Sequence, residues 1–186
     1  MHPANQVVNT GQTASFTAAA NGNPTPSVKW QVSTNNGSSW SDISGATSLT
    51  YSFTAQSTDN GKQYRAVFTN VAGSATSDAA VLTVNYAPAV TTQPANQTVN
   101  AGQTASFTAA ASGNPSPTVQ WQVSTNNGSS WSDIAGATSL TYSFTAQVTD
   151  NGKQYRAVFT NTIGSATSSA ALLKISNLVY LPFLYK

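Results

Sequence analysis

The chain contains the same segment twice. The sequence from His2 to Asn85 aligns without a gap with the sequence from Gln93 to Ser176, at a fixed offset of 91 residues, and only 16 of the 84 aligned positions differ. A repeat of this length has the size of a small independent domain, whereas solenoid repeats span only about 20 to 50 residues. The sequence therefore predicts two tandem domains, 1–85 and 93–176, with a linker at 86–92 and an unrepeated tail at 177–186.

Charged side chains make up only 6% of the residues, and glutamate is absent. The seven lysines and arginines are scattered, so the pI of about 9.0 reflects the scarcity of carboxylates and indicates no basic patch for nucleic acid. No stretch reaches the roughly 18 to 20 apolar residues of a membrane span. The N-terminus lacks the pattern of a secretory signal, so we presume that a signal has been removed from an exported protein.

Apolar alternation predicts β-structure throughout. Val28, Trp30 and Val32 alternate with polar neighbours, which is the pattern of a half-buried strand, and Asn36-Gly37 then tolerates the positive φ of a tight turn. Segments of the first copy that are rich in Thr, Val, Phe and Tyr cover residues 12–20, 27–33, 47–54, 62–70 and 75–84. Each copy is expected to form about seven strands in two packed sheets.

Two motifs occur in each copy. In the first copy, residues 11–30 read Gly-x-x-x-x-Phe-Thr-Ala-x-x-x-Gly-x-Pro-x-Pro-x-Val-x-Trp, and residues 59–66 read Asp-x-Gly-x-x-Tyr-x-Ala. Together these motifs resemble the immunoglobulin-like (Ig-like) family. The resemblance implies tandem Greek-key β-sandwiches in an all-β protein, with Trp30 and Trp121 in the core. It also implies that Tyr64 and Tyr155 are buried corner residues whose hydroxyls bond to the backbone.

The chain has no cysteine, which departs from the usual family pattern. The positions of the family's inter-sheet disulfide hold Ala18 and Ala66 in the first copy, and Ala109 and Ala157 in the second. In this respect the chain resembles cysteine-free Ig-like repeats of bacterial surface proteins, which often carry the run Trp-Gln-x-Ser-x-x-x-Gly-x-x-Trp. That run spans residues 30–40 and 121–131.

The residues provide little for catalysis. The chain has one histidine, His2, and its five aspartates are not arranged in a closely spaced series. Asp59 and Asp150 precede the corner tyrosines, where a short carboxylate accepts backbone N–H bonds. We therefore expect no enzyme activity, no cofactor and no metal site.

Trp40 and Trp131 are the candidate glycan contacts. An indole beside Ser, Thr and Asn side chains can stack on a sugar ring, and Ig-like sandwiches serve as glycan-binding modules. The alternative is that each indole covers the edge of its own core.

The linker and the tail suggest how the domains are used. Pro88 and Pro94 favour an extended linker, and hence an end-to-end arrangement of the domains. The tail resembles the Tyr-Leu-Pro-rich ending of secreted Chloroflexota-type proteins, and it could fold back on its own domain, act as a sorting signal, or be a strand donated to a neighbouring molecule. Alternation places its apolar side chains on two faces, Val179, Leu181, Phe183 and Tyr185 on one and Leu178, Tyr180, Pro182 and Leu184 on the other.

The sequence thus predicts a structural protein of the cell exterior. The first hypothesis is a subunit of an extracellular filament that polymerises head to tail with itself by docking its C-terminal strand on the next subunit. The alternatives are a stalk or adhesin segment of a larger cell-surface protein, and a glycan-binding module.

Overall fold

The computed structural model describes residues 1–176, which divide into two units that separate between Tyr86 and Ala87. The eight tail residues predicted to form an assembly interface, 178–185, lie outside the described residues. Apart from two single turns of 3-10 helix, η1 (Ser57–Asp59) and η2 (Val148–Asp150), the secondary structure of the described chain is β-strand, as predicted. None of its helices is long and apolar enough to cross a membrane.

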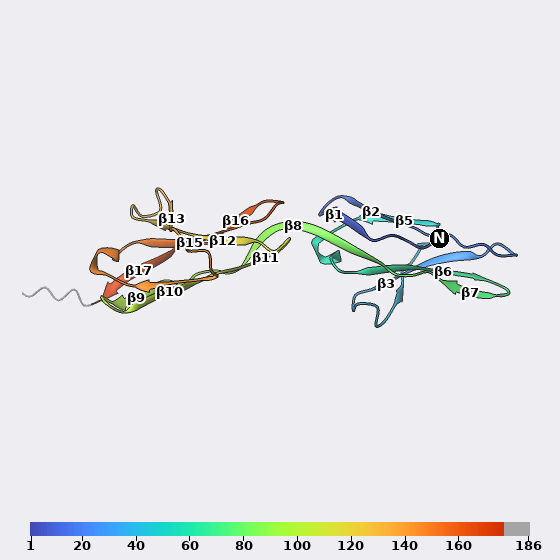
Figure 1. Cartoon of the computed structure of the whole chain (residues 1–186), viewed down its shortest axis with the longest axis horizontal. Helices are drawn as coiled ribbons and strands as arrows, with labels where there is room; N and C mark the ends of the chain where they lie inside the picture. The colour runs from blue at the N-terminus through green and yellow to red at the C-terminus, as the bar shows by residue number, and fades with distance from the viewer. Residues whose placement is uncertain (177–186) are drawn as a thin grey trace, which may run out of the picture. The chain divides into compact units, whose positions relative to one another are not determined.

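Each unit consists of a larger and a smaller sheet (Figure 1). In the first unit the larger sheet has the order β1-β8-β6-β3-β4, with β7 also paired to β6, and the smaller sheet pairs β2 with β5. The strands are β1 (Gln6–Asn9), β2 (Thr13–Thr17), β3 (Ser27–Ser33), β4 (Ser41–Asp42), β5 (Thr50–Thr54), β6 (Gln63–Asn70), β7 (Gly73–Thr76) and β8 (Ala80–Thr92). This is the two-sheet Ig-like sandwich that the motifs indicated.

The second unit repeats this topology. Its larger sheet has the order β13-β12-β15-β17-β9, with β16 paired to β15, and its smaller sheet pairs β10 with β14. The strands are β9 (Gln97–Asn100), β10 (Thr104–Thr108), β11 (Ala110–Asn114), β12 (Thr118–Ser124), β13 (Ser132–Asp133), β14 (Thr141–Thr145), β15 (Gln154–Thr160), β16 (Ser165–Thr167) and β17 (Ala171–Ser176). β11 has no counterpart in the first unit, and it pairs with β8.

Residues 86–92, which the sequence predicts as a linker, are extended. They form the second half of β8, and residues 87–92 belong to the second unit. The segment is therefore part of the sheet structure of the domain that follows it.

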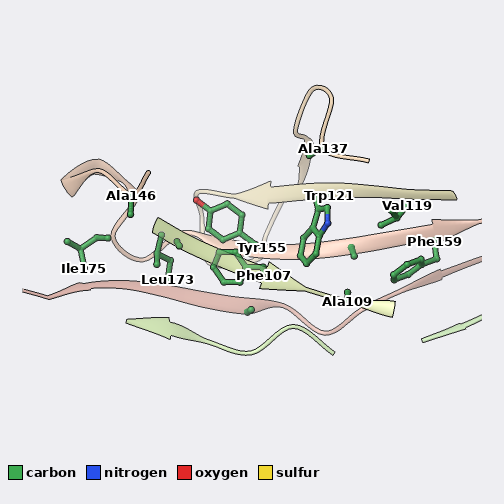
Figure 2. Close-up of a cluster of buried hydrophobic side chains, with 13 residues drawn as sticks. Phe107, Ala109, Val119, Trp121, Ala137, Ala146, Tyr155, Phe159, Leu173 and Ile175 are labelled. Carbon is green, nitrogen blue, oxygen red and sulfur yellow. The ribbon is translucent and has the colours of Figure 1, made fainter. Parts of the chain in front are cut away.

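An indole occupies the centre of each core. Trp30 on β3 is fully buried and lies directly opposite Ala66 on β6, while Ala18 is also fully buried. The Trp30 Nε1 group donates a hydrogen bond to the Ser48 carbonyl over 2.9 Å, so burial leaves no donor unpaired. In the second unit Trp121 is fully buried opposite Ala157, and Ala109 is also fully buried. Figure 2 shows Trp121 and Ala109 in this core. The small alanines thus leave room for the indole where the family usually has a disulfide.

The predicted corner tyrosines are buried, with about 3% of each residue exposed. The Tyr64 ring stacks on Phe16 with centroids 4.7 Å apart, and Tyr155 stacks on Phe107 at the same distance (Figure 2). Burial, together with the nearby Asp59 carboxylate, raises the pKa of Tyr64. Among the described residues neither hydroxyl makes a hydrogen bond to the backbone, which differs from the corner bond that the resemblance implies. Aromatic stacking, not that bond, holds the two rings.

Asp59 organises the turn before β6. Its carboxylate accepts the Gln56 backbone N–H over 2.8 Å and pairs with the Lys62 ammonium over 2.7 Å. Burial alone would raise the pKa of Asp59, but the hydrogen bonds from Lys62 and Gln56 outweigh it, so the pKa lies below its usual value. Asp150 repeats these contacts in the second unit. The structural role expected for these aspartates is confirmed.

Replacing Trp30 with Ala should destabilise the first unit by about 3 to 5 kcal/mol, because it removes a buried aromatic side chain and leaves a cavity. The second unit keeps Trp121 and serves as an internal reference. Urea unfolding of the Trp30→Ala chain should therefore show two transitions, with the first unit unfolding at the lower urea concentration. In the Trp121→Ala chain the second unit should unfold first. A decrease of less than about 1 kcal/mol in the free energy of unfolding of the first unit would contradict the central role of Trp30.

Candidate functional site

The most elaborate polar surface of each unit lies on the outer face of its larger sheet. In the first unit we call the row Trp40, Arg65, Gln31 and Asp42 the outer ladder. Strand alternation creates it, because Arg65 projects from β6 between the buried Tyr64 and Ala66, and Gln31 projects from β3 beside the buried Trp30. The register pairs Gln31 with both Arg65 and Asp42, so the three side chains share one face.

A rigid loop positions Trp40. Asn36 and Gly37 both adopt positive φ, +58° and +85°, a backbone conformation that Asn and Gly tolerate best. The buried Ser33 hydroxyl donates to Asn35 Oδ1 and accepts the Gly37 N–H, each over 2.9 Å. The indole Nε1 of Trp40 donates to the Gly37 carbonyl over 3.1 Å. These bonds fix the plane of the half-buried indole.

The ladder is continuous from the indole to the carboxylate. The Arg65 guanidinium carbon lies 4.1 Å from the ring centroid of Trp40, within cation–π range. Arg65 Nε donates to Gln31 Oε1 over 2.8 Å, and Gln31 Nε2 donates to Asp42 Oδ1 over 2.6 Å. One face of the indole is therefore in contact with a cation.

The second unit has the same ladder in Trp131, Arg156, Gln122 and Asp133, with the guanidinium carbon 4.2 Å from the indole centroid. The two ladders differ at one end. Lys29 pairs with Asp42 over 2.7 Å, and its hydrogen bond, with that from Gln31, lowers the pKa of Asp42. The aligned residue Gln120 instead donates to the backbone carbonyls of Trp121 and Ile134. Only the first of the two ladders ends in an ammonium group.

Trp40 and Trp131 are half-buried and are not among the residues of the two core clusters. Each indole stacks on an arginine side chain, a contact that neither sequence hypothesis included. Their half-exposed rings remain available to a ligand together with neighbouring amide and guanidinium donors, and the glycan contact stays a prediction. The sequence could not reveal that Arg65 is the stacking partner of Trp40, because only the pairing of β3 with β6 brings the two side chains together.

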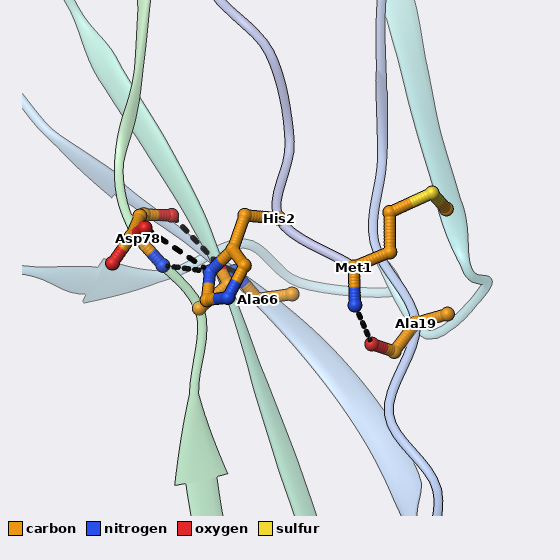
Figure 3. Close-up of polar contacts among 6 residues, drawn as sticks. Met1, His2, Ala19, Ala66 and Asp78 are labelled. Atoms are coloured by element: carbon orange, nitrogen blue, oxygen red, sulfur yellow. Dashed lines mark hydrogen bonds and ion pairs between the residues drawn. The ribbon is translucent and has the colours of Figure 1, made fainter.

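Little in the described residues suggests catalysis. No group of three or more His, Asp or Glu side chains there could hold a metal ion. The sole histidine, His2, accepts the Asp78 backbone N–H at Nδ1 and lies 3.4 Å from the Asp78 carboxylate (Figure 3). In the second unit the aligned residue Gln93 accepts the backbone N–H of Ser169 at its Oε1 atom, so an amide oxygen replaces the imidazole nitrogen in this contact.

Comparison with known proteins identifies the family. A family model described as a domain of unknown function (DUF8696) matches residues 1–86 and again residues 89–177. The chain belongs to this family. Its two DUF8696 domains have the Ig-like fold, since the chain superimposes on the N-terminal four Ig domains of Dscam1 isoform 6.9 with a TM-score of 0.61 and 26% identity. That match covers 92% of this chain and 43% of the other.

Two curated relatives carry similar sequences within much longer chains. Endoglucanase C of Cellulomonas fimi is 45% identical over 174 residues, which cover 93% of this chain and 16% of that protein. Leucine-rich repeats and immunoglobulin-like domains protein 2 of Homo sapiens is 40% identical over 76 residues, which cover 41% of this chain and 7% of that protein. This DUF8696 pair thus spans a small part of either relative.

A double-mutant cycle between Trp40 and Arg65 should give a coupling energy of about 0.5 to 1 kcal/mol, since the pair is half-exposed and only partly desolvated. Urea unfolding of the wild-type chain, Trp40→Ala, Arg65→Ala and the double variant measures it. The matched cycle on Trp131 and Arg156 should agree, because the geometry is the same. A coupling indistinguishable from zero in both units would show that the stacking contributes nothing to stability.

Proposed function

We propose that the chain is a pair of non-catalytic Ig-like spacer domains within a larger extracellular protein. The observation that carries this proposal is β8, which forms the last strand of the first domain and then continues, without an intervening loop, into the structure of the second. A strand that runs on without a loop suits consecutive domains that connect other parts of a longer polypeptide. The relation to a short segment of Endoglucanase C supports an accessory role next to a catalytic domain.

The extracellular setting is part of the same proposal. A surface built largely from uncharged Ser, Thr, Asn and Gln, with 6% charged residues, is unusual for a cytosolic protein and common in cell-surface repeats. Stalk or adhesin segments of larger cell-surface proteins are spacers of this kind.

The filament hypothesis from the sequence differs from the spacer hypothesis in one measurable property. A filament subunit polymerises through residues 177–186, whereas a spacer does not. We expect the full chain to remain monomeric in sedimentation velocity experiments from about 1 to 100 µM, and a variant that lacks 177–186 to do the same. Concentration-dependent polymers of the full chain that disappear in the truncated variant would contradict the spacer proposal and support the filament.

Glycan binding is a second function that a spacer could carry, and the outer ladder favours it. Each ladder offers a half-exposed indole beside amide and guanidinium donors, a combination suited to a sugar ring and its hydroxyls. The occurrence of the family in an endoglucanase makes a soluble glucan the first ligand to test.

If the ladders bind glucan, replacing both Trp40 and Trp131 with Ala should weaken binding by about tenfold or more in isothermal titration, because the stacking surface is lost. Replacing the exposed Leu49 and Leu140 with Ala provides the matched control and should leave the affinity unchanged. Equal affinity of the two double variants for glucan, or no glucan binding by the wild-type chain, would contradict glycan binding by the ladders.

A further inference from the structure

The arginine of each outer ladder is a cation without a carboxylate partner. Lys29, Lys62 and Lys153 each pair with an aspartate over 2.7 Å. Arg65 and Arg156 form no ion pair in the part of the chain that the structure describes, and an indole and a neutral glutamine amide hold each of them instead. The charge of both guanidinium groups is therefore left for an anion that does not belong to the described chain.

The ladder also orients the outer end of the guanidinium group. Arg65 Nε donates to Gln31 Oε1 over 2.8 Å, and the guanidinium carbon lies 4.1 Å from the centroid of the Trp40 ring. Within residues 1–176 the terminal nitrogens, Nη1 and Nη2, have no hydrogen-bond partner. Since no buried side-chain nitrogen of the described residues lacks a partner, these two atoms reach solvent. Two N–H groups on a fixed planar fork match the two oxygens of a carboxylate.

The second ladder repeats this geometry. Arg156 Nε donates to Gln122 Oε1 over 2.8 Å, and the guanidinium carbon lies 4.2 Å from the centroid of the Trp131 ring. Its terminal nitrogens likewise have no partner among the described residues and reach solvent. The open fork is therefore a property of the domain that both copies share.

The two ladders differ in the charge around the fork. In the first ladder Lys29 pairs with Asp42 over 2.7 Å, so two cations stand beside one carboxylate and one positive charge remains. In the second ladder Gln120 replaces the lysine, and Asp133 has no ion-pair partner in the described part of the chain. The charges of Arg156 and Asp133 then cancel. A carboxylate ligand is therefore attracted more strongly to the first ladder than to the second.

We propose that the outer ladder of the first domain binds a glycan built from uronic acids, which carry carboxylates, and that Lys29 makes this ladder the stronger of the two sites. The inference rests on the glycan binding proposed above and names the class of sugar. The carboxylate pairs with the terminal nitrogens of Arg65, and the sugar ring lies against the exposed part of Trp40. A neutral glucan can contact the indole but leaves the cation without a partner.

Oligogalacturonate and its fully methyl-esterified form test the class of sugar, because esterification removes the charge and keeps the sugar and the chain length. Each is titrated into the full chain, and the indole N–H resonances of Trp40 and Trp131 report on the two ladders separately by NMR. At Trp40 the acid should bind at least about tenfold more tightly than the ester, because it forms a charge-assisted bidentate pair. The difference should shrink in about 0.5 M NaCl, since salt screens an exposed ion pair.

Exchanging Lys29 and Gln120 tests the difference between the domains. Each substitution introduces the residue that the other domain already carries at the same position, so the fold should be kept. Lys29→Gln should weaken binding of the acid at Trp40 by about fivefold, and Gln120→Lys should strengthen it at Trp131 by a similar factor, because one unit charge is lost or gained. Binding of the ester should stay the same in both variants.

Equal affinity of the acid and the ester at Trp40 would overturn this proposal and leave glycan binding itself intact. Unchanged affinity for the acid in both exchanged variants would overturn the role of Lys29. If neither sugar shifts either indole resonance, glycan binding by the ladders is refuted together with this inference. Sedimentation tests the spacer function separately.

Discussion

The packing of one indole against two alanines is the contact on which each domain depends. Without a disulfide, the two sheets are held together by apolar burial, and Trp30 contributes the largest side chain to that interface. Since Trp30 faces inward and lies opposite Ala66, the whole register of β3 against β6 is fixed, and a shift by one residue would turn every buried side chain outward. Phe16, Tyr51 and Tyr64 extend the aromatic cluster around it.

The outer ladder is a consequence of the same register. Residues that alternate with the core positions on β3 and β6 face solvent, so the contacts that bury Trp30 also bring Arg65 beside Gln31. Trp40 joins the ladder from a loop that Ser33, itself buried, holds in place. A mutation that loosens the core would therefore be expected to disorder the candidate glycan surface as well.

The repeat, the strands and the central indoles were predictable because each rests on local pattern or on fixed spacing in the sequence. The position of Trp40 was not, since its partner Arg65 is 25 residues away and is brought near only by strand pairing. The role of residues 87–92 was also missed. Two prolines and small residues indicate an extended connector, but only the non-local pairing with β11 makes that connector part of a sheet. The tail remains a sequence-based hypothesis, outside the described residues.

The near identity of the two domains has a consequence for how the chain folds. β2 and β10 have the same sequence, Thr-Ala-Ser-Phe-Thr, and so do their partners β5 and β14, Thr-Tyr-Ser-Phe-Thr. A strand that is released during synthesis or refolding therefore finds two equivalent partners, and pairing with the wrong one satisfies every local hydrogen bond and apolar contact of that sheet. The choice of the correct partner strand must therefore depend on the shorter loop that correct pairing closes, and on the few positions at which the two copies differ. Slow, trapped species with exchanged strands are the characteristic failure of such a chain, and sequence divergence between neighbouring domains is what suppresses them.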